Sequence, residues 1–180
     1  MPLTTDAVPI TLAAPVPWAA TVSVPQINQE QTEWCWAACA QMVLQFYGDS
    51  TVQQCDLATQ LFGEPTCCSD PSSALCNEPA QVPDIAGVYA SRGRNANLVI
   101  GSVPFETLQD EINANRPVEI GFAWNDGTGH QALVCGWNVD DTGPYLLVND
   151  PRWGSGAVYY VNLVAAYGWG SWQWTWVSMA

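Results

Sequence analysis

Apolar side chains recur with a helical period in roughly the first two thirds of the chain and with a strand period after that. The clearest helical stretch, Trp34–Tyr47, contains no Pro or Gly, stops before Gly48 and has an apolar face of Cys35, Cys39, Met42 and Phe46. This pattern predicts a buried central helix. Further helices are predicted over Ser50–Phe62, where Ser50 and Gln53 resemble a capping box, Val82–Ser91 and Pro104–Asn115.

Beyond Arg116 the chain consists of short runs rich in β-branched and aromatic residues, separated by Asp, Gly and Asn turns. We expect strands over Val118–Trp124, His130–Trp137, Tyr145–Asp150, Ala157–Leu163 and Trp172–Met179. Helices followed by strands predict an α+β domain, with its helical half and its antiparallel β half packed across a cleft.

A single domain is expected, because the 180 residues are 48% hydrophobic and only 12% charged, which suits one core. We place this domain at residues 25–180, with a helical half at about 25–116 and a β half at about 117–180. The Pro-rich residues 1–24 are expected to form an extended arm on the domain. This arm has no positively charged start and no continuous apolar block, so it does not resemble an intact signal peptide.

The chain is strongly acidic, with 17 Asp and Glu against four Arg and a formal charge of −13. It has no basic stripe for nucleic acid, and an anionic membrane surface would repel it. No apolar run reaches the roughly 18 to 20 residues of a membrane span. The single His, His130, excludes multi-histidine metal sites. We expect no metal, no cofactor and no nucleic-acid or membrane partner, and we expect a monomer.

Four of the seven Cys residues, Cys55, Cys67, Cys68 and Cys76, lie in a loop-rich segment, which predicts a disulfide-stapled insert. Cys67 and Cys68 are neighbours and do not readily bridge each other, so two pairings that join Cys55 and Cys76 to different members of the doublet stay open. Zinc binding is the alternative for this cluster. Disulfides indicate an oxidising compartment, so we expect a secreted protein.

Cys35 is the candidate nucleophile, because the free amides and the positive end of the predicted helix stabilise a thiolate in its first turn. A thiolate nucleophile needs an imidazole as proton acceptor and donor, and His130 follows Gly129 at the start of a strand. Asp150 ends the next strand, so a hairpin near residues 140–144 would bring it to the sheet edge that carries His130. Strand alternation points the neighbouring Asn149 to the opposite face.

A side-chain amide near Cys35 could donate a hydrogen bond to the oxyanion of an acyl-transfer reaction. Gln29 lies six residues before Cys35 and is the candidate, with Gln26 and Gln31 as competitors. Cys39 and Cys135 have no assigned role, and Cys135 is expected to be a buried free thiol.

Three segments resemble the signatures of papain-like cysteine peptidases: QEQTEWCWAAC at 29–39, GHQALVCGW at 129–137 and VNDP at 148–151. The chain looks most like the compact bacterial relatives, the avirulence-effector and bacteriocin-leader-processing groups. The resemblance implies a papain-like fold in which the central helix carries the nucleophile and an antiparallel sheet or half-barrel forms the second half. It implies Cys35 as nucleophile, His130 as base and acid, Asp150 as its orienter, Gln29 as oxyanion donor and a protein or peptide substrate.

Two other functions stay open. Papain-like relatives also include enzymes that transfer an acyl group or remove a leader peptide, so hydrolysis of ordinary protein substrates is not the only outcome. The second alternative is a non-catalytic extracellular binding module. On that interpretation Trp172, Trp174 and Trp176, at every second position of the last strand, would form a ligand-binding platform.

Overall fold

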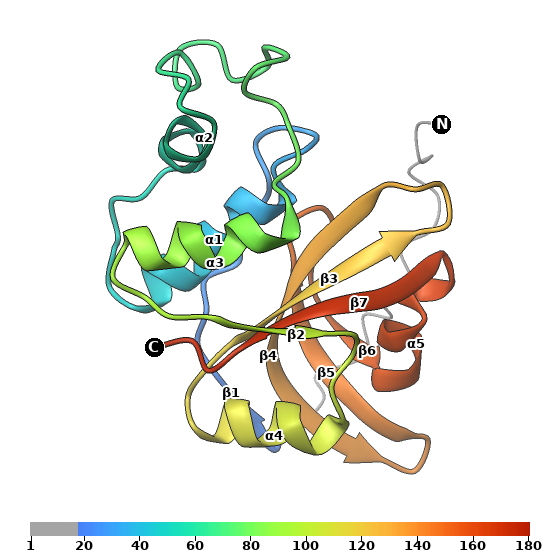
Figure 1. The fold of residues 1–180 in the computed structure, drawn as a ribbon. Coiled ribbons are helices and arrows are strands. Elements are labelled where there is room, and N and C mark those ends of the chain that lie inside the picture. Colours follow the sequence, from blue (N-terminus) through green and yellow to red (C-terminus); the bar gives the residue numbers. More distant parts are fainter. Residues whose placement is uncertain (1–17) are drawn as a thin grey trace.

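The computed structural model describes residues 18–180, which form a cluster of helices packed against one twisted antiparallel sheet (Figure 1). Within these residues no helix is both long and apolar enough to cross a membrane. Most of the expected Pro-rich arm lies outside the described residues. Its last part contains the short strand β1 (Ala20–Thr21), which pairs with β4.

The helical half contains α1 (Cys35–Phe46), α2 (Gln54–Phe62) and α3 (Val82–Ser91). As predicted, α1 is the buried central helix, and it packs on β4 of the sheet and on both other helices. The side chains of Trp36, Met42 and Leu44 on α1 are almost fully buried in the core. Burial of such apolar side chains, at about 1.5–3 kcal/mol each, holds α1 in place.

The sheet has the strand order β2-β7-β3-β4-β5-β6, with all pairs antiparallel. Its strands are β2 (Asn97–Ile100), β3 (Val118–Trp124), β4 (Gly129–Asp140), β5 (Gly143–Asp150), β6 (Gly154–Tyr159) and β7 (Gly170–Val177). Helix α4 (Phe105–Asn113) covers one end of the sheet beside β1 and β4, while α5 (Tyr160–Val164) and the short helix η1 (Ala166–Gly168) connect β6 to β7 (Figure 1). The predicted α+β class is confirmed.

Three local predictions differ from the structure. Helix α2 does not begin at Ser50: its N-cap is Gln53, whose capping box is closed by Asp56. The predicted strand over Ala157–Leu163 ends at Tyr159, and the chain turns into α5 so that Leu163 is fully buried. Strand β2 was not expected: its four residues are all solvent-exposed and pair with β7 at the edge of the sheet. For α2 and α5, capping or packing overrides the local apolar pattern.

Candidate active site

Cys35 is the first residue of α1, at the end of the helix where backbone amides have no partner within the helix. No side chain caps this end, so the amides and the helix dipole are available to stabilise negative charge at the Cys35 sulfur or at a bound substrate. Cys35 is half-buried and its thiol is not in a disulfide. These features suit a nucleophile.

The other two free Cys residues of residues 18–180 are buried. Burial, with the nearby Glu119 carboxyl as a second cause, raises the pKa of Cys39 well above its ordinary value. Burial also raises the pKa of Cys135 to about 12. Both thiols therefore stay protonated and out of contact with solvent, as expected for Cys135. Among the described residues, Cys35 is the free thiol that a substrate can reach.

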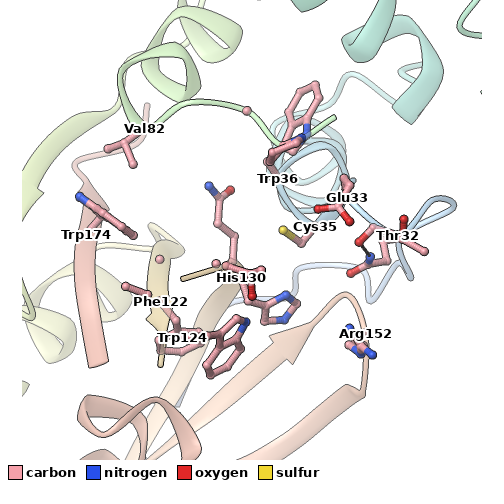
Figure 2. A pocket seen from close by; sticks show the side chains of 18 of the residues that line it. Thr32, Glu33, Cys35, Trp36, Val82, Phe122, Trp124, His130, Arg152 and Trp174 are labelled. Atoms are coloured by element: carbon pink, nitrogen blue, oxygen red, sulfur yellow. Dashed lines mark hydrogen bonds between the residues drawn. The ribbon is translucent and has the colours of Figure 1, made fainter. Parts of the chain in front are cut away.

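His130, at the start of β4, and Asp150, at the end of β5, meet at the same end of the sheet, as the hairpin prediction expected. His130 Nε2 lies 2.9 Å from Asp150 Oδ1, and both side chains are buried. Because a carboxylate only accepts hydrogen bonds, Nε2 carries the proton that it donates, which leaves Nδ1 as the ring nitrogen available to the Cys35 thiol. Figure 2 shows the Cys35 sulfur, from the helical half, and the His130 ring, from the sheet, projecting into the same cleft.

The environment of His130 favours its charged form. Burial alone would lower the pKa of the imidazole, but the charge of Asp150 and the hydrogen bond to it, together with a hydrogen bond to Cys35, raise this pKa to about 10. A buried carboxylate beside the ring therefore outweighs the loss of hydration. An imidazolium beside a sulfur atom is the arrangement that cysteine nucleophiles use for activation.

Asp150 is held by several hydrogen bonds. Its Oδ1 atom accepts the backbone amides of Arg152 at 2.8 Å and Trp153 at 3.2 Å, so the Asp-Pro turn itself fixes the carboxylate. Its Oδ2 atom accepts a hydrogen bond of 3.2 Å from the Tyr167 hydroxyl. Tyr167 has a left-handed backbone with φ of 56°, an unfavourable conformation for a residue with a side chain. The fold thus keeps Tyr167 in a strained position in which its hydroxyl reaches Asp150.

Aromatic rings surround the imidazole. The Trp124 ring lies nearly parallel to the His130 ring, with the centroids 5.9 Å apart, and the Trp153 ring is steeply inclined to it, with the centroids 5.2 Å apart. These indoles limit rotation of the imidazole and keep water from the bond between His130 and Asp150. Gly129, just before His130, runs so close to β3 that an added Cβ would lie 3.0 Å from the Phe122 carbonyl oxygen.

Gln29 is the only one of the three candidate glutamines that lines the cleft formed by the described residues. Its backbone amide bonds to the Pro151 carbonyl at 2.9 Å, which ties the loop before α1 to the turn after Asp150. The side-chain Nε2 of Gln29 donates to the carbonyls of Gln31 and Thr32, both at 2.8 Å. Its amide is therefore beside the Cys35 end of α1, but its two protons are occupied by the loop's own carbonyls.

The cleft has a volume of about 720 Å³ and contains Cys35 and His130. Its walls come from both halves of the fold: Trp36 and Val82 from the helices, and Trp124 and Trp174 from the sheet (Figure 2). Of the three alternating indoles of β7, Trp174 lines this cleft, whereas Trp172 and Trp176 are buried. The structure therefore contradicts the platform of three exposed indoles on which the binding-module alternative depended.

The Cys-rich insert contacts the chain just before α1. Its four Cys residues form the disulfides Cys55–Cys68 and Cys67–Cys76, one of the two pairings left open, which leaves no thiolate there for the zinc alternative. The Trp34 Nε1 atom donates to the Cys76 carbonyl at 2.7 Å, immediately before the start of α1. This hydrogen bond connects the insert to the loop that precedes Cys35 and so helps to fix that loop.

Comparison with models of known protein families identifies the family of this chain. Residues 21–175 match the model described as the Peptidase_C39 like family. The chain belongs to this family. It is a papain-like cysteine protease, and the suspected relationship to compact papain-like peptidases is confirmed.

Solved structures agree on the papain-like fold. A double glycine motif protease from an AMS/PCAT transporter, solved in complex with the leader peptide, has a TM-score of 0.58 and 16% identity, over 88% of this chain and 93% of that one. A structure on the mite allergens Blo t 1 and Der p 1 gives a TM-score of 0.55 and 13% identity, over 93% of this chain and 73% of that one. No curated protein sequence matches the chain significantly.

Sequence reasoning missed three residues that this cysteine protease places around His130 and Asp150. Trp153 had a usable signal, since an Asp-Pro turn commonly directs the following amides back to the Asp side chain. Trp124 ends a predicted strand, but its stacking on His130 depends on the pairing of β3 with β4. Tyr167 is brought to Asp150 by η1, which no local pattern predicted.

Proposed function

We propose that the protein is a cysteine endopeptidase that hydrolyses peptide bonds through a thioester on Cys35. The bond of 2.9 Å between His130 and Asp150, in the cleft that also holds Cys35, is the observation that supports this most strongly. In the first step the Cys35 thiolate attacks the peptide carbonyl carbon, and the oxygen gains negative charge. The His130 imidazolium then gives its proton to the leaving amine as the carbon–nitrogen bond breaks, and the thioester remains.

Hydrolysis completes the cycle. Neutral His130 takes a proton from a water molecule, whose oxygen attacks the thioester carbonyl carbon. The resulting tetrahedral intermediate expels the Cys35 thiolate and releases the carboxylic acid, which restores the ion pair. Asp150 holds the imidazole in one tautomer and orientation throughout.

The oxyanion would be stabilised by the Cys35 backbone amide and by Gln29. In the free enzyme Gln29 Nε2 donates to two carbonyls of its own loop, so this role requires one of these bonds to be exchanged for a bond to the oxyanion. An oxyanion donor is worth roughly 10²–10³ in kcat. Its position between α1 and the turn after Asp150 supports Gln29 over Gln26, whose side chain donates instead to the Asp150 carbonyl.

A second candidate function is removal of a leader peptide. It is favoured by the family match and by the similar fold of a protease solved in complex with the leader peptide. Both functions use the same acyl-enzyme chemistry. We also propose that the protein works in an oxidising compartment, such as outside the cell, because its insert is closed by two disulfides in the described residues.

Incubation with an unstructured protein such as reduced casein, followed by mass spectrometry of the new termini, tests the endopeptidase proposal. We expect internal cleavages that disappear in Cys35→Ser and His130→Ala and persist in Cys135→Ser, a matched change at a buried thiol. Cleavage confined to the junction of a leader-like peptide would favour the second function. Internal cleavage that persists in Cys35→Ser would rule out the proposed nucleophile.

A further inference from the structure

Gln131 follows His130 on β4 and lines the same cleft. Across the sheet it stands opposite Gly121 of β3, which in turn stands opposite Trp174 of β7. An added Cβ at Gly121 would lie 3.1 Å from Trp174 Cε3, so the Trp174 ring leans over the glycine. Gln131 and Trp174 therefore form one wall of the cleft beside Cys35 and His130, and Val82 of the helical half lies on the same side as Trp174 (Figure 2).

The Gln131 side chain carries a buried acceptor without a partner. Gln131 is only 9% exposed, and its Oε1 atom accepts no hydrogen bond from residues 18–180. A buried polar atom without a partner is destabilising, and most buried acceptors in folded proteins are paired. By contrast, the buried Gln41 donates to the Val52 carbonyl at 2.8 Å, and the buried Gln54 donates to Gln41 Oε1 at 3.1 Å. Gln29, in the same cleft, also has an unpaired Oε1 atom, but its Nε2 atom is bonded to the carbonyls of Gln31 and Thr32.

We propose that Gln131 is a specificity-determining residue whose Oε1 accepts a hydrogen bond from a hydroxyl or carboxamide group on a substrate side chain. The apolar part of that side chain packs against Trp174 and Val82. This inference rests on the proposed peptidase function, because it assigns a subsite in the same cleft.

We expect the substrate group that donates to Gln131 Oε1 to be neutral, because this oxygen is buried. A cationic side chain would lose most of its hydration at a buried amide oxygen, and a neutral amide does not compensate for a full charge. The acidic residues of the cleft, Glu33 and Asp126, are both exposed and remain hydrated. Thr, Asn and Gln fit the site, whereas Val, Leu and Met have similar volume but leave Gln131 Oε1 unpaired.

Matched peptides measure this preference. A positional library first identifies which substrate position near the cleaved bond is selective, and kcat/KM is then compared for Thr and Val, and for Gln and Met, at that position. Since a site built to bond a polar group discriminates against the analogue that lacks it, we expect at least a tenfold preference for Thr and Gln. Gln131→Met removes the acceptor at similar volume and should abolish most of this preference while cleavage of the Val and Met peptides continues.

Two variants control the experiment. Gln173→Met changes a glutamine next to Trp174 that does not line the cleft and whose Nε2 donates to Ser171 Oγ, so it should keep the wild-type preference. Gln131→Glu keeps an acceptor and adds charge, which should move the preference toward Lys and Arg. Gln131→Glu therefore tests the role of Gln131 even if Gln131→Met fails to fold.

The possible failures are distinguishable. Peptide cleavage without any preference for polar side chains, or a preference that Gln131→Met retains, would overturn the role of Gln131 and leave the peptidase proposal intact. No cleavage of any peptide, together with no selective alkylation of Cys35, would overturn the proposed function and this inference with it.

Discussion

The buried carboxyl of Glu119 should make folding stability depend on pH in an unusual direction. Glu119 lies on β3 under the helical half and is fully buried. Its Oε2 atom accepts a hydrogen bond of 2.6 Å from the hydroxyl of Tyr89 on α3, while Oε1 has no partner among the described residues. Burial raises the pKa of Glu119 from its ordinary 4.5 to about 8, although the bond from Tyr89 opposes the shift.

Glu119 makes the unfolding free energy fall as the pH rises, because the folded chain holds this proton more tightly than the unfolded chain does. The unfolded chain loses this proton near pH 4.5, whereas the folded chain keeps it until about pH 8. The stability associated with the protonated carboxyl is therefore complete below about pH 4.5 and is lost as the pH rises through 8. Between these values the slope approaches about 1.4 kcal/mol per pH unit, so the whole loss is roughly 4–5 kcal/mol.

Glu119→Gln keeps the shape of the side chain and removes this titration. Urea unfolding of both proteins from pH 5 to pH 8 should show the variant gaining about 3–4 kcal/mol in unfolding free energy relative to the wild type over that range. Subtracting the two curves cancels the titration of His130, which both proteins share. Glu106→Gln, an exposed change on α4, should leave the wild-type curve unchanged. Parallel curves for wild type and Glu119→Gln would refute the reasoning.

Three further substitutions test the site and its support. Asp150→Ala should lower kcat at least tenfold with little change in KM, and the alkaline limb of the pH–rate profile should move below its wild-type position, because the carboxylate that raises the pKa of His130 to about 10 is gone. Gln29→Ala should lower kcat by roughly 10²-fold, as measured with a fluorogenic peptide, whereas the same effect from Gln31→Ala would show that the oxyanion donor is misassigned. The double change of Cys67 and Cys76 to Ala should lower the unfolding free energy by about 2–3 kcal/mol in urea titrations, since it removes a disulfide that closes a short loop, and an unchanged midpoint would contradict this.

The sequence predicted the structure best where candidate catalytic residues lie in segments with a clear helical or strand pattern. The α1 prediction succeeds because Trp34–Tyr47 has no helix breaker and is followed by Gly48, which has a φ of 100°. The sequence could predict that His130 and Asp150 reach the same end of the sheet, because β4 and β5 form a tight hairpin in which Asp140 pairs with Gly143. It could not predict the shared face, because a register shift between Val134 and Gly136 turns Asp150, rather than Asn149, to the side of His130. The α1 argument needs only local pattern and standard helix geometry.

What the sequence could not supply depends on packing between distant segments. The apolar run after β6 has strand-like residues, yet it forms α5, whose Tyr160 hydroxyl is anchored by the Val103 carbonyl at 2.8 Å. The bond from Tyr167 to Asp150 and the unpaired acceptor of Gln131 likewise emerge only once β3, β4 and η1 are assembled. Disulfide pairing was narrowed to two alternatives by the adjacency of Cys67 and Cys68, and the fold selects one of them.

Selective alkylation of Cys35 tests the proposed activated pair most directly. Iodoacetamide at low concentration and about pH 6 reacts slowly with an ordinary thiol, whose pKa is about 8.5, but readily with a thiolate paired to an imidazolium. Peptide mapping by mass spectrometry should find the adduct at Cys35 in the wild type, and labelling should fall sharply in His130→Ala. Labelling spread over several Cys residues, or no adduct at Cys35, would contradict an activated nucleophile in this cleft.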